Sequence, residues 1–175
     1  MDSGRELRTL AGHWNWVRGV ALSRDGWVAV SASEDRTLKV WDVGSGHELF
    51  TLSGHKLPVT AVAVTPDGQR AVTASHDQTL KVWDLASGGE LRTLSGHSRY
   101  VNAVVVTPDG QRAVSASFDN TVKVWTLETG ECLATFTGDC AARCCAHSDV
   151  VNLIVAGDAG GHLHFLRLEE PKPYA

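Results

Sequence analysis

The sequence has no long hydrophobic run. No stretch approaches the roughly 18–20 apolar residues that span a bilayer, and residues 1–5 are not followed by the apolar segment of a secretory signal peptide. These absences predict a protein with no membrane partner, and the compartment we expect is the cytoplasm.

An excess of charge of either sign is also lacking. The 175 residues include 16 Lys and Arg against 20 Asp and Glu, which gives a formal net charge of −4. A protein that binds nucleic acid without sequence preference needs a strongly basic face. The charge balance therefore predicts that nucleic acid is not a partner.

Cysteine is absent before position 132, and the four cysteines are Cys132, Cys140, Cys144 and Cys145. Cys144 and Cys145 are neighbours on an expected strand, so their side chains should point to opposite faces, which disfavours a shared metal site. We expect small core residues here, with no disulfide, metal or other cofactor. His162 and His164 share a face and could in principle bind a metal ion together. His164, however, occupies the repeat position of Lys39, which favours a solvated side chain and not a metal ligand.

What the sequence does contain is a repeat. The pair Gly-His occurs at positions 12–13, 54–55 and 96–97, and the same 42-residue interval next reaches Gly138-Asp139. A second marker lies 28 residues after each His, at Trp41-Asp42, Trp83-Asp84 and Trp125-Thr126. The chain is therefore four copies of one unit, which begin near Gly12, Gly54, Gly96 and Gly138.

This pattern resembles the WD40-repeat family over nearly the whole chain. The resemblance implies an all-β fold, a WD40-type β-propeller with four four-stranded antiparallel blades per chain. We expect an N-terminal tail at residues 1–5, the four-blade array at residues 6–168 and a C-terminal tail at residues 169–175.

The third copy shows how the repeat makes strands. Apolar and alternating stretches predict strands at residues 101–106, 111–117, 122–127 and 131–136. Thr107-Pro108-Asp109-Gly110 supplies the first turn and Phe118-Asp119-Asn120-Thr121 the second. Helix-period patterning is absent.

Repeated polar residues suggest a structural device, because an active site needs one constellation and these occur in three units. In the family that the chain resembles, such residues form a hydrogen-bond network within each blade. The matching residues are His13, Ser31 or Ser33, Asp35 and Trp41; His55, Thr73 or Ser75, Asp77 and Trp83; and His97, Ser115 or Ser117, Asp119 and Trp125. Of the two hydroxyl residues in each set, we assign Ser33, Ser75 and Ser117 to the network.

The fourth copy departs from the network at every position. Asp139, Ala156, Asp158, Gly160 and Leu166 replace the residues that build it elsewhere. The Pro-Gly turn is also replaced, by residues 148–151. We expect this blade to lack the network and to be the least stable.

The two ends of the array are complementary. Residues 6–10 match the fourth strands at residues 48–52 and 90–94, whereas the last copy has only three strand segments. The N-terminal strand should complete the last blade, in the same chain or in a partner chain. Three arrangements stay open: two chains in an eight-bladed ring, one chain closed as four blades, or part of a longer array. We favour the two-chain ring, with a second copy as partner, because a half-ring would expose apolar faces and strand edges.

Variation among the copies falls just after Gly-His and just before the turn Asp. In the family that the chain resembles, these positions lie on the top face, where partners dock. The candidate binding residues are Trp16, Arg18, Glu34, Pro58, Thr60, His76, Tyr100, Asn102 and Phe118. Loops also vary when nothing constrains them, but large aromatics are enriched at binding hot spots.

The function that follows is a non-enzymatic scaffold for a protein or peptide, such as a docking or sensor module of a larger signalling protein. The alternative is an amplified or engineered array whose main property is self-assembly into a closed ring. We find no unrepeated nucleophile and base, and no phosphate-binding glycine loop before a helix, so no catalytic residue is expected.

Overall fold

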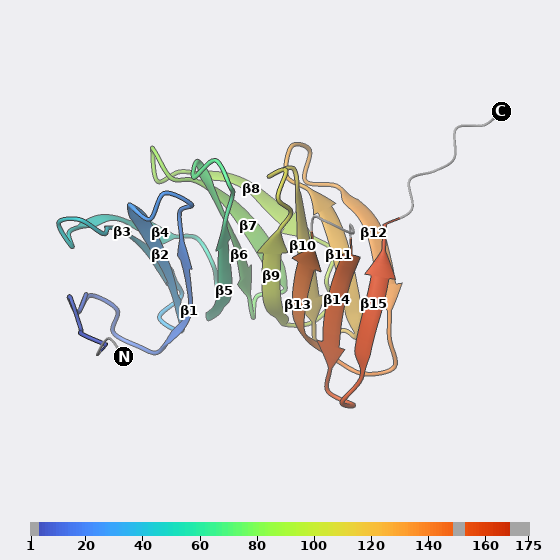
Figure 1. Cartoon of the computed structure of the whole chain (residues 1–175). Coiled ribbons are helices and arrows are strands. Elements are labelled where there is room, and N and C mark those ends of the chain that lie inside the picture. The colour runs from blue at the N-terminus through green and yellow to red at the C-terminus, as the bar shows by residue number, and fades with distance from the viewer. Residues whose placement is uncertain (1–3, 149–152, 169–175) are drawn as a thin grey trace.

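The computed structural model describes residues 4–148 and 153–168. Within this part of the chain the fold is all-β, with four antiparallel sheets standing side by side in an arc (Figure 1). The tail at residues 169–175 and most of the replaced turn at residues 148–151 lie outside the described residues. No helix in the described part is long and apolar enough to cross a membrane.

Three sheets have four strands each. The first contains β1 (Val17–Leu22), β2 (Val28–Ser33), β3 (Thr37–Asp42) and β4 (Glu48–Ser53). The second contains β5 (Val59–Val64), β6 (Arg70–Ser75), β7 (Thr79–Asp84) and β8 (Glu90–Ser95). The third contains β9 (Val101–Val106), β10 (Arg112–Ser117), β11 (Thr121–Thr126) and β12 (Cys132–Thr137). These bounds lie within a residue or so of those predicted from the third copy.

The fourth sheet has only three strands, β13 (Ala142–Ser148), β14 (Leu153–Asp158) and β15 (Leu163–Arg167). The expected fourth strand at residues 6–10 is not formed: these residues carry no strand pairing and lie against the first sheet. The structure therefore does not show a ring in which residues 6–10 complete the last blade of the same chain. In the described part of the chain, the outer edge of β15 has no strand partner.

The core lies between neighbouring sheets, which we call blades 1 to 4. The innermost strands β1, β5, β9 and β13 contact one another in that order. Between blades 1 and 2, buried Leu38 and Val40 pack with Val59, Val62 and Trp83. Blades 2 and 3 and blades 3 and 4 have equivalent clusters. Each blade is therefore stabilised mainly by its neighbours, as expected for a repeat protein.

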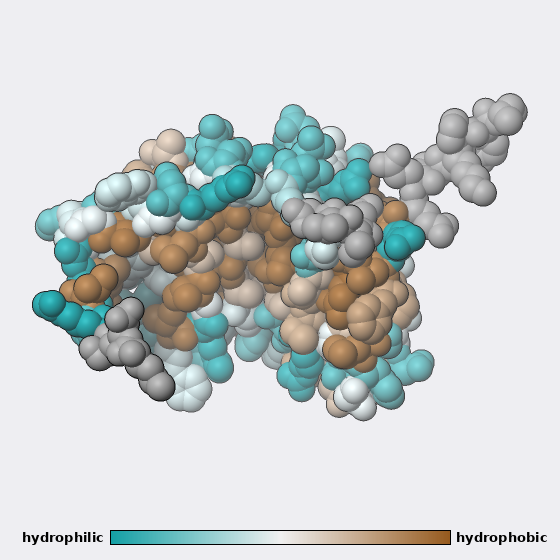
Figure 2. All heavy atoms as spheres, viewed as in Figure 1, coloured by the Kyte–Doolittle hydropathy of each residue, from teal (hydrophilic) through white to brown (hydrophobic). Residues whose placement is uncertain are grey.

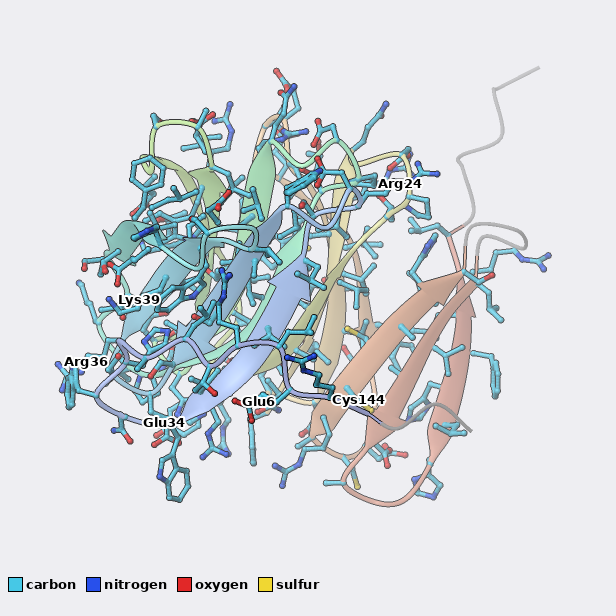
Figure 3. The ribbon with its side chains drawn as sticks, turned by 60° about the vertical axis from the view of Figure 1, so that its left-hand side comes forward. Glu6, Arg24, Glu34, Arg36, Lys39 and Cys144 are labelled. Atoms are coloured by element: carbon cyan, nitrogen blue, oxygen red, sulfur yellow. The ribbon has the colours of Figure 1, made fainter. Side chains whose placement is uncertain are left out.

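Turn residues explain why the strands reverse where they do. In blade 2, Thr65 Oγ1 accepts from Arg70 N at 3.0 Å, Gly68 has φ +71°, and the chain turns from β5 to β6. The β2–β3 type of turn places Arg36, Gln78 and Asn120 at positive φ, between an Asp and a Thr in each case. Glu34 and Arg36 therefore lie at one end of the first sheet and Arg24, in the β1–β2 turn, at the other (Figure 3).

Candidate partner-binding surface

The repeated polar residues form one hydrogen-bonded chain inside each of blades 1 to 3. In blade 2, His55 Nδ1 lies 2.8 Å from Asp77 Oδ2, His55 Nε2 lies 2.8 Å from Thr73 Oγ1, and Trp83 Nε1 donates to Thr73 Oγ1 at 3.0 Å. The same bonds join His13, Asp35, Ser31 and Trp41 in blade 1, and His97, Asp119, Ser115 and Trp125 in blade 3.

The donors and acceptors fix the protonation of the His. The carboxylate of Asp119 can only accept, so His97 Nδ1 carries the proton. Ser115 Oγ already accepts from Trp125 Nε1, and its own hydrogen is best used by His97 Nε2, which leaves a neutral imidazole. Burial lowers the pKa of His97, in agreement with a neutral ring.

The Asp at the end of each hydrogen-bond network is ionised. Burial would raise the pKa of Asp119, but hydrogen bonds from Thr121, the Ser98 backbone N–H and His97 outweigh burial and lower this pKa to about 2. The pKa of Asp77 is also lowered, because hydrogen bonds from His55 and Thr79 outweigh its burial. These carboxylates are saturated acceptors and leave no free base for catalysis.

The hydroxyl of each network is not the one we assigned. Ser31, Thr73 and Ser115 join His to Trp, whereas Ser33, Ser75 and Ser117 hold the turns. Ser33 Oγ accepts from Asp35 N at 3.1 Å and donates to Asn15 O at 3.2 Å. The reason is the register: residues two apart share a face, and Ser31 pairs with Lys39, two residues from Trp41, whereas Ser33 lies beyond the last pair of β2 and β3, next to the turn.

Blade 4 lacks this network but has a different one, which the sequence did not reveal. Asp158 Oδ2 lies 3.0 Å from His164 Nε2 and 3.2 Å from His162 Nδ1, and Asp158 Oδ1 accepts from the backbone N–H of Gly160 and His162. Hydrogen bonds, that from His164 above all, lower the pKa of Asp158. The carboxylate thus holds the β14–β15 turn in place of the missing turn Asp.

The cysteines of this region are all free thiols. Cys132 and Cys144 are exposed, so the expectation of core positions is wrong for these two. Cys145 packs against the core between blades 3 and 4, and burial raises its pKa to about 12. Among residues 4–148 and 153–168 no three His, Cys, Asp or Glu side chains are grouped so that they could hold a metal ion.

A row of rings and one guanidinium crosses the face at the β2–β3 end of the blades. His76 stacks on Tyr100 with ring centroids 4.4 Å apart, and Tyr100 meets the edge of Phe118 at 6.2 Å. The guanidinium of Arg143 lies 4.2 Å from the centre of the Phe118 ring. Blades 2, 3 and 4 thus contribute to one continuous surface.

This row borders a hollow of about 520 Å³ near the axis of the arc. Its lining residues are Arg18, Thr60, His76, Tyr100, Asn102, Phe118 and Arg143. Six of these were candidates from the sequence. Arg143 was missed, although it occupies in the fourth copy the position of Arg18, Thr60 and Asn102, so the repeat alignment could have found it.

Two lining residues are already engaged in joining blades. Thr60 Oγ1 donates to Val101 O at 2.6 Å, and Asn102 Nδ2 donates to Ala142 O at 2.8 Å. Each bond links one blade to the next. These side chains shape the wall of the hollow and at the same time join the blades.

The remaining candidates lie outside the hollow. Trp16 is exposed, and the guanidinium of Arg18 lies 5.1 Å from the centre of its ring. Arg18 Nε also donates to Glu34 Oε1 at 2.7 Å. Pro58 is half-buried and its carbonyl accepts from His76 N and Ser75 Oγ, so its role is in the turn.

A second hollow of about 380 Å³ lies on the other side of the ring pair Tyr100 and Phe118. Gln78 and Arg99 complete its lining. Tyr100 and Phe118 therefore form a ridge between two hollows, and Tyr100 is 46% exposed. The sequence did not indicate Gln78.

Comparison with known families settles the class of this fold. The family described as WD domain, G-beta repeat matches residues 4–42, 46–84 and 88–126, more than half of the chain. The chain belongs to the WD40-repeat family. Each matched range contains the first three strands of blade 1, 2 or 3 and the segment before them. The match ends before blade 4, in which the residues typical of a WD40 unit are replaced.

Individual relatives are similar over a single WD40 unit. Nuclear distribution protein PAC1 of Ajellomyces capsulatus is 50% identical over 40 residues, which are 23% of this chain and 9% of that protein. Lissencephaly-1 homolog 1 of Paramecium tetraurelia and Small ribosomal subunit protein RACK1 of Caenorhabditis elegans are each 48% identical over 40 residues, 23% of this chain and 10% and 12% of the respective proteins. The matches thus span only about a tenth of the relatives' own length.

Proposed function

We propose that this chain is a non-enzymatic scaffold that binds an extended segment of a protein partner at the ring-lined hollow. The observation that carries the proposal is the convergence of Tyr100, Phe118 and Arg143 from blades 3 and 4 with Arg18 from blade 1 around one hollow. Aromatic and arginine side chains are the residue types that most often supply binding energy at protein interfaces.

Charge favours an acidic partner. Two arginines and no carboxylate line the hollow. Arg18 is already paired with Glu34, but no carboxylate of the described residues forms an ion pair with Arg143. A carboxylate or phosphate of the partner between these arginines would gain hydrogen bonds to a guanidinium in a partly desolvated site. The ridge of Tyr100 and Phe118 would take an apolar side chain next to it.

The repeated networks support a scaffold over an enzyme. The network pairs His13–Asp35, His55–Asp77 and His97–Asp119 are held in hydrogen bonds that repeat from blade to blade. None of these residues is both free and unrepeated, as a nucleophile or a general base would be.

The test uses a phage-displayed library of linear peptides selected on the immobilised chain. We expect enrichment of peptides with acidic residues next to an apolar residue. Tyr100→Ala and Arg143→Ala should each weaken binding of a selected peptide about tenfold or more, as loss of a hot-spot residue does.

Trp27→Ala is the matched control, because Trp27 is 60% exposed on the β1–β2 turn at the opposite end of the sheet. It should leave peptide binding unchanged. A library that enriches nothing, or peptides that respond to Trp27→Ala and not to Tyr100→Ala, would show that the hollow is not a binding site.

A further inference from the structure

The first and last blades each expose one apolar face, of a kind that is buried wherever another blade packs against it. On β15, Phe165 is 66% exposed, whereas Val40, Val82 and Val124 at the same repeat position are 0–4% exposed. On β1, Val20 is 74% exposed, against 9% for Val62 and 5% for Val104. Figure 2 shows hydrophobic side chains gathered on the face over β13–β15.

The two exposed faces are complementary to each other. Between blades 1 and 2, the face that bears Val40 packs against the face that bears Val62. Blade 4 exposes the first kind of face and blade 1 the second kind. A second copy of the chain would therefore repeat, at each end, the packing that joins the inner blades.

Residues 6–10 already lie where the outer strand of a preceding blade belongs. Phe50 on β4 and Arg92 on β8, the outer strands of blades 1 and 2, reach the turns at Gly88 and Gly130 of the following blade. Arg8, at the same repeat position, lies against Gly46 in the same manner, and its guanidinium donates to Gly44 O at 2.9 Å. Leu10 remains 37% exposed, whereas Leu52 and Leu94 at its repeat position are 2% and 1% exposed.

We propose that two copies of this chain associate head to tail, with residues 6–10 of each copy adding the fourth strand to the β13–β15 sheet of the other. The pairing in blade 1, where Leu38, Lys39 and Val40 lie opposite Leu52, Thr51 and Phe50, sets the register. Leu163, His164 and Phe165 then lie opposite Leu10, Thr9 and Arg8 of the second copy.

This arrangement closes both ends at once. Eight blades turn by about 45° each, so that four blades cover half a ring and two copies complete it. Closure covers both apolar faces and pairs the open edge of β15, which otherwise invites further association.

The test is the mass of the 175-residue chain by light scattering after gel filtration, over a wide range of protein concentration. We expect twice the chain mass of 18.8 kDa. Phe165→Asp and Val20→Asp should each raise the dissociation constant at least about a hundredfold, because an unpaired carboxylate would be buried in the new interface. Both residues are exposed in the single chain, so these variants keep their fold, and circular dichroism verifies it.

Leu91→Asp is the matched control, since Leu91 on β8 is also exposed but lies on neither end face. Mixing Phe165→Asp with Val20→Asp restores one intact contact, so the mixture should recover part of the dimer that each variant has lost. A monomer at every concentration, an assembly larger than two chains, or a dimer that survives Phe165→Asp and Val20→Asp would overturn the proposal. If the chain is a monomer, these faces would instead be covered by further blades of a longer protein or by closure of one chain on itself.

Discussion

The hydroxyl of Thr73 is the point where the polar network of blade 2 can be cut without opening a cavity. Thr73 is completely buried, accepts from Trp83 Nε1 and contacts His55 Nε2. Thr73→Val replaces the hydroxyl with a methyl group of similar size. The packing stays the same, and only the hydrogen bonds are lost.

The magnitude follows from the groups left behind. The Trp83 N–H and the His55 Nε2 are both buried, and each unsatisfied buried polar group costs about 1–3 kcal/mol. With partial relaxation we expect Thr73→Val to lower the free energy of unfolding by about 2–4 kcal/mol. Thr73→Ser keeps the hydroxyl and loses one methyl group, which costs about 1 kcal/mol.

Urea unfolding followed by tryptophan fluorescence measures both variants against the parent at one protein concentration, since association would make stability depend on concentration. Ser31 and Ser115 already perform this role in the neighbouring blades, so Thr73→Ser is the matched control. If Thr73→Val proves as stable as Thr73→Ser, the network does not contribute to stability and the reasoning fails.

Three further predictions follow from the same structure. The lowered pKa values of His97 and Asp119 mean that the unfolded chain binds protons more readily, so stability should fall as the pH drops below about 6.5 and fall again between about 4 and 2. In pH-dependent unfolding curves, Asp119→Asn should make the second decrease smaller without removing it, because the pKa values of Asp77 and Asp158 are also lowered; a second decrease of unchanged size would contradict the role of Asp119. Gly88→Ala should be more destabilising than Gly26→Ala, because both glycines have positive φ but only the Cβ at Gly88 would lie 2.9 Å from Phe50; equal thermal midpoints would argue against this packing. Cys145 should react with a thiol reagent far more slowly than exposed Cys132, as peptide mapping would show, since burial raises its pKa to about 12; comparable rates would contradict its place in the core.

The repeat made most of the fold predictable. Strand positions in blades 1 to 3 follow from short apolar segments between turns that contain Gly or an Asp-x-Thr sequence, and such signals depend on neighbouring residues alone. The choice between Ser31 and Ser33 could not be made this way. Both face the same side of β2, and only the position of the Trp41 ring determines which hydroxyl it reaches.

The candidate surface was predictable where the copies could be aligned. Tyr100 and Phe118 were identified because they vary at matched positions, and the structure brings them together at one hollow. The Asp158 cluster was not predictable, because it exists only in blade 4 and depends on how the β14–β15 turn folds. Residues 6–10 have the sequence of a strand, yet strand formation needs a partner edge, which a single copy does not present to them.

One position of the repeat has two incompatible uses. Thr60 and Asn102 bond to the backbone of the following blade, while Arg18 and Arg143, at the same position, face the hollow. A blade that uses this side chain to bond its neighbour contributes no arginine to the proposed binding surface. Duplicating an inner unit, which carries Thr or Asn at this position, would therefore add a bond between blades and no arginine to the hollow, so the positive charge of the hollow depends on the blades at the two ends.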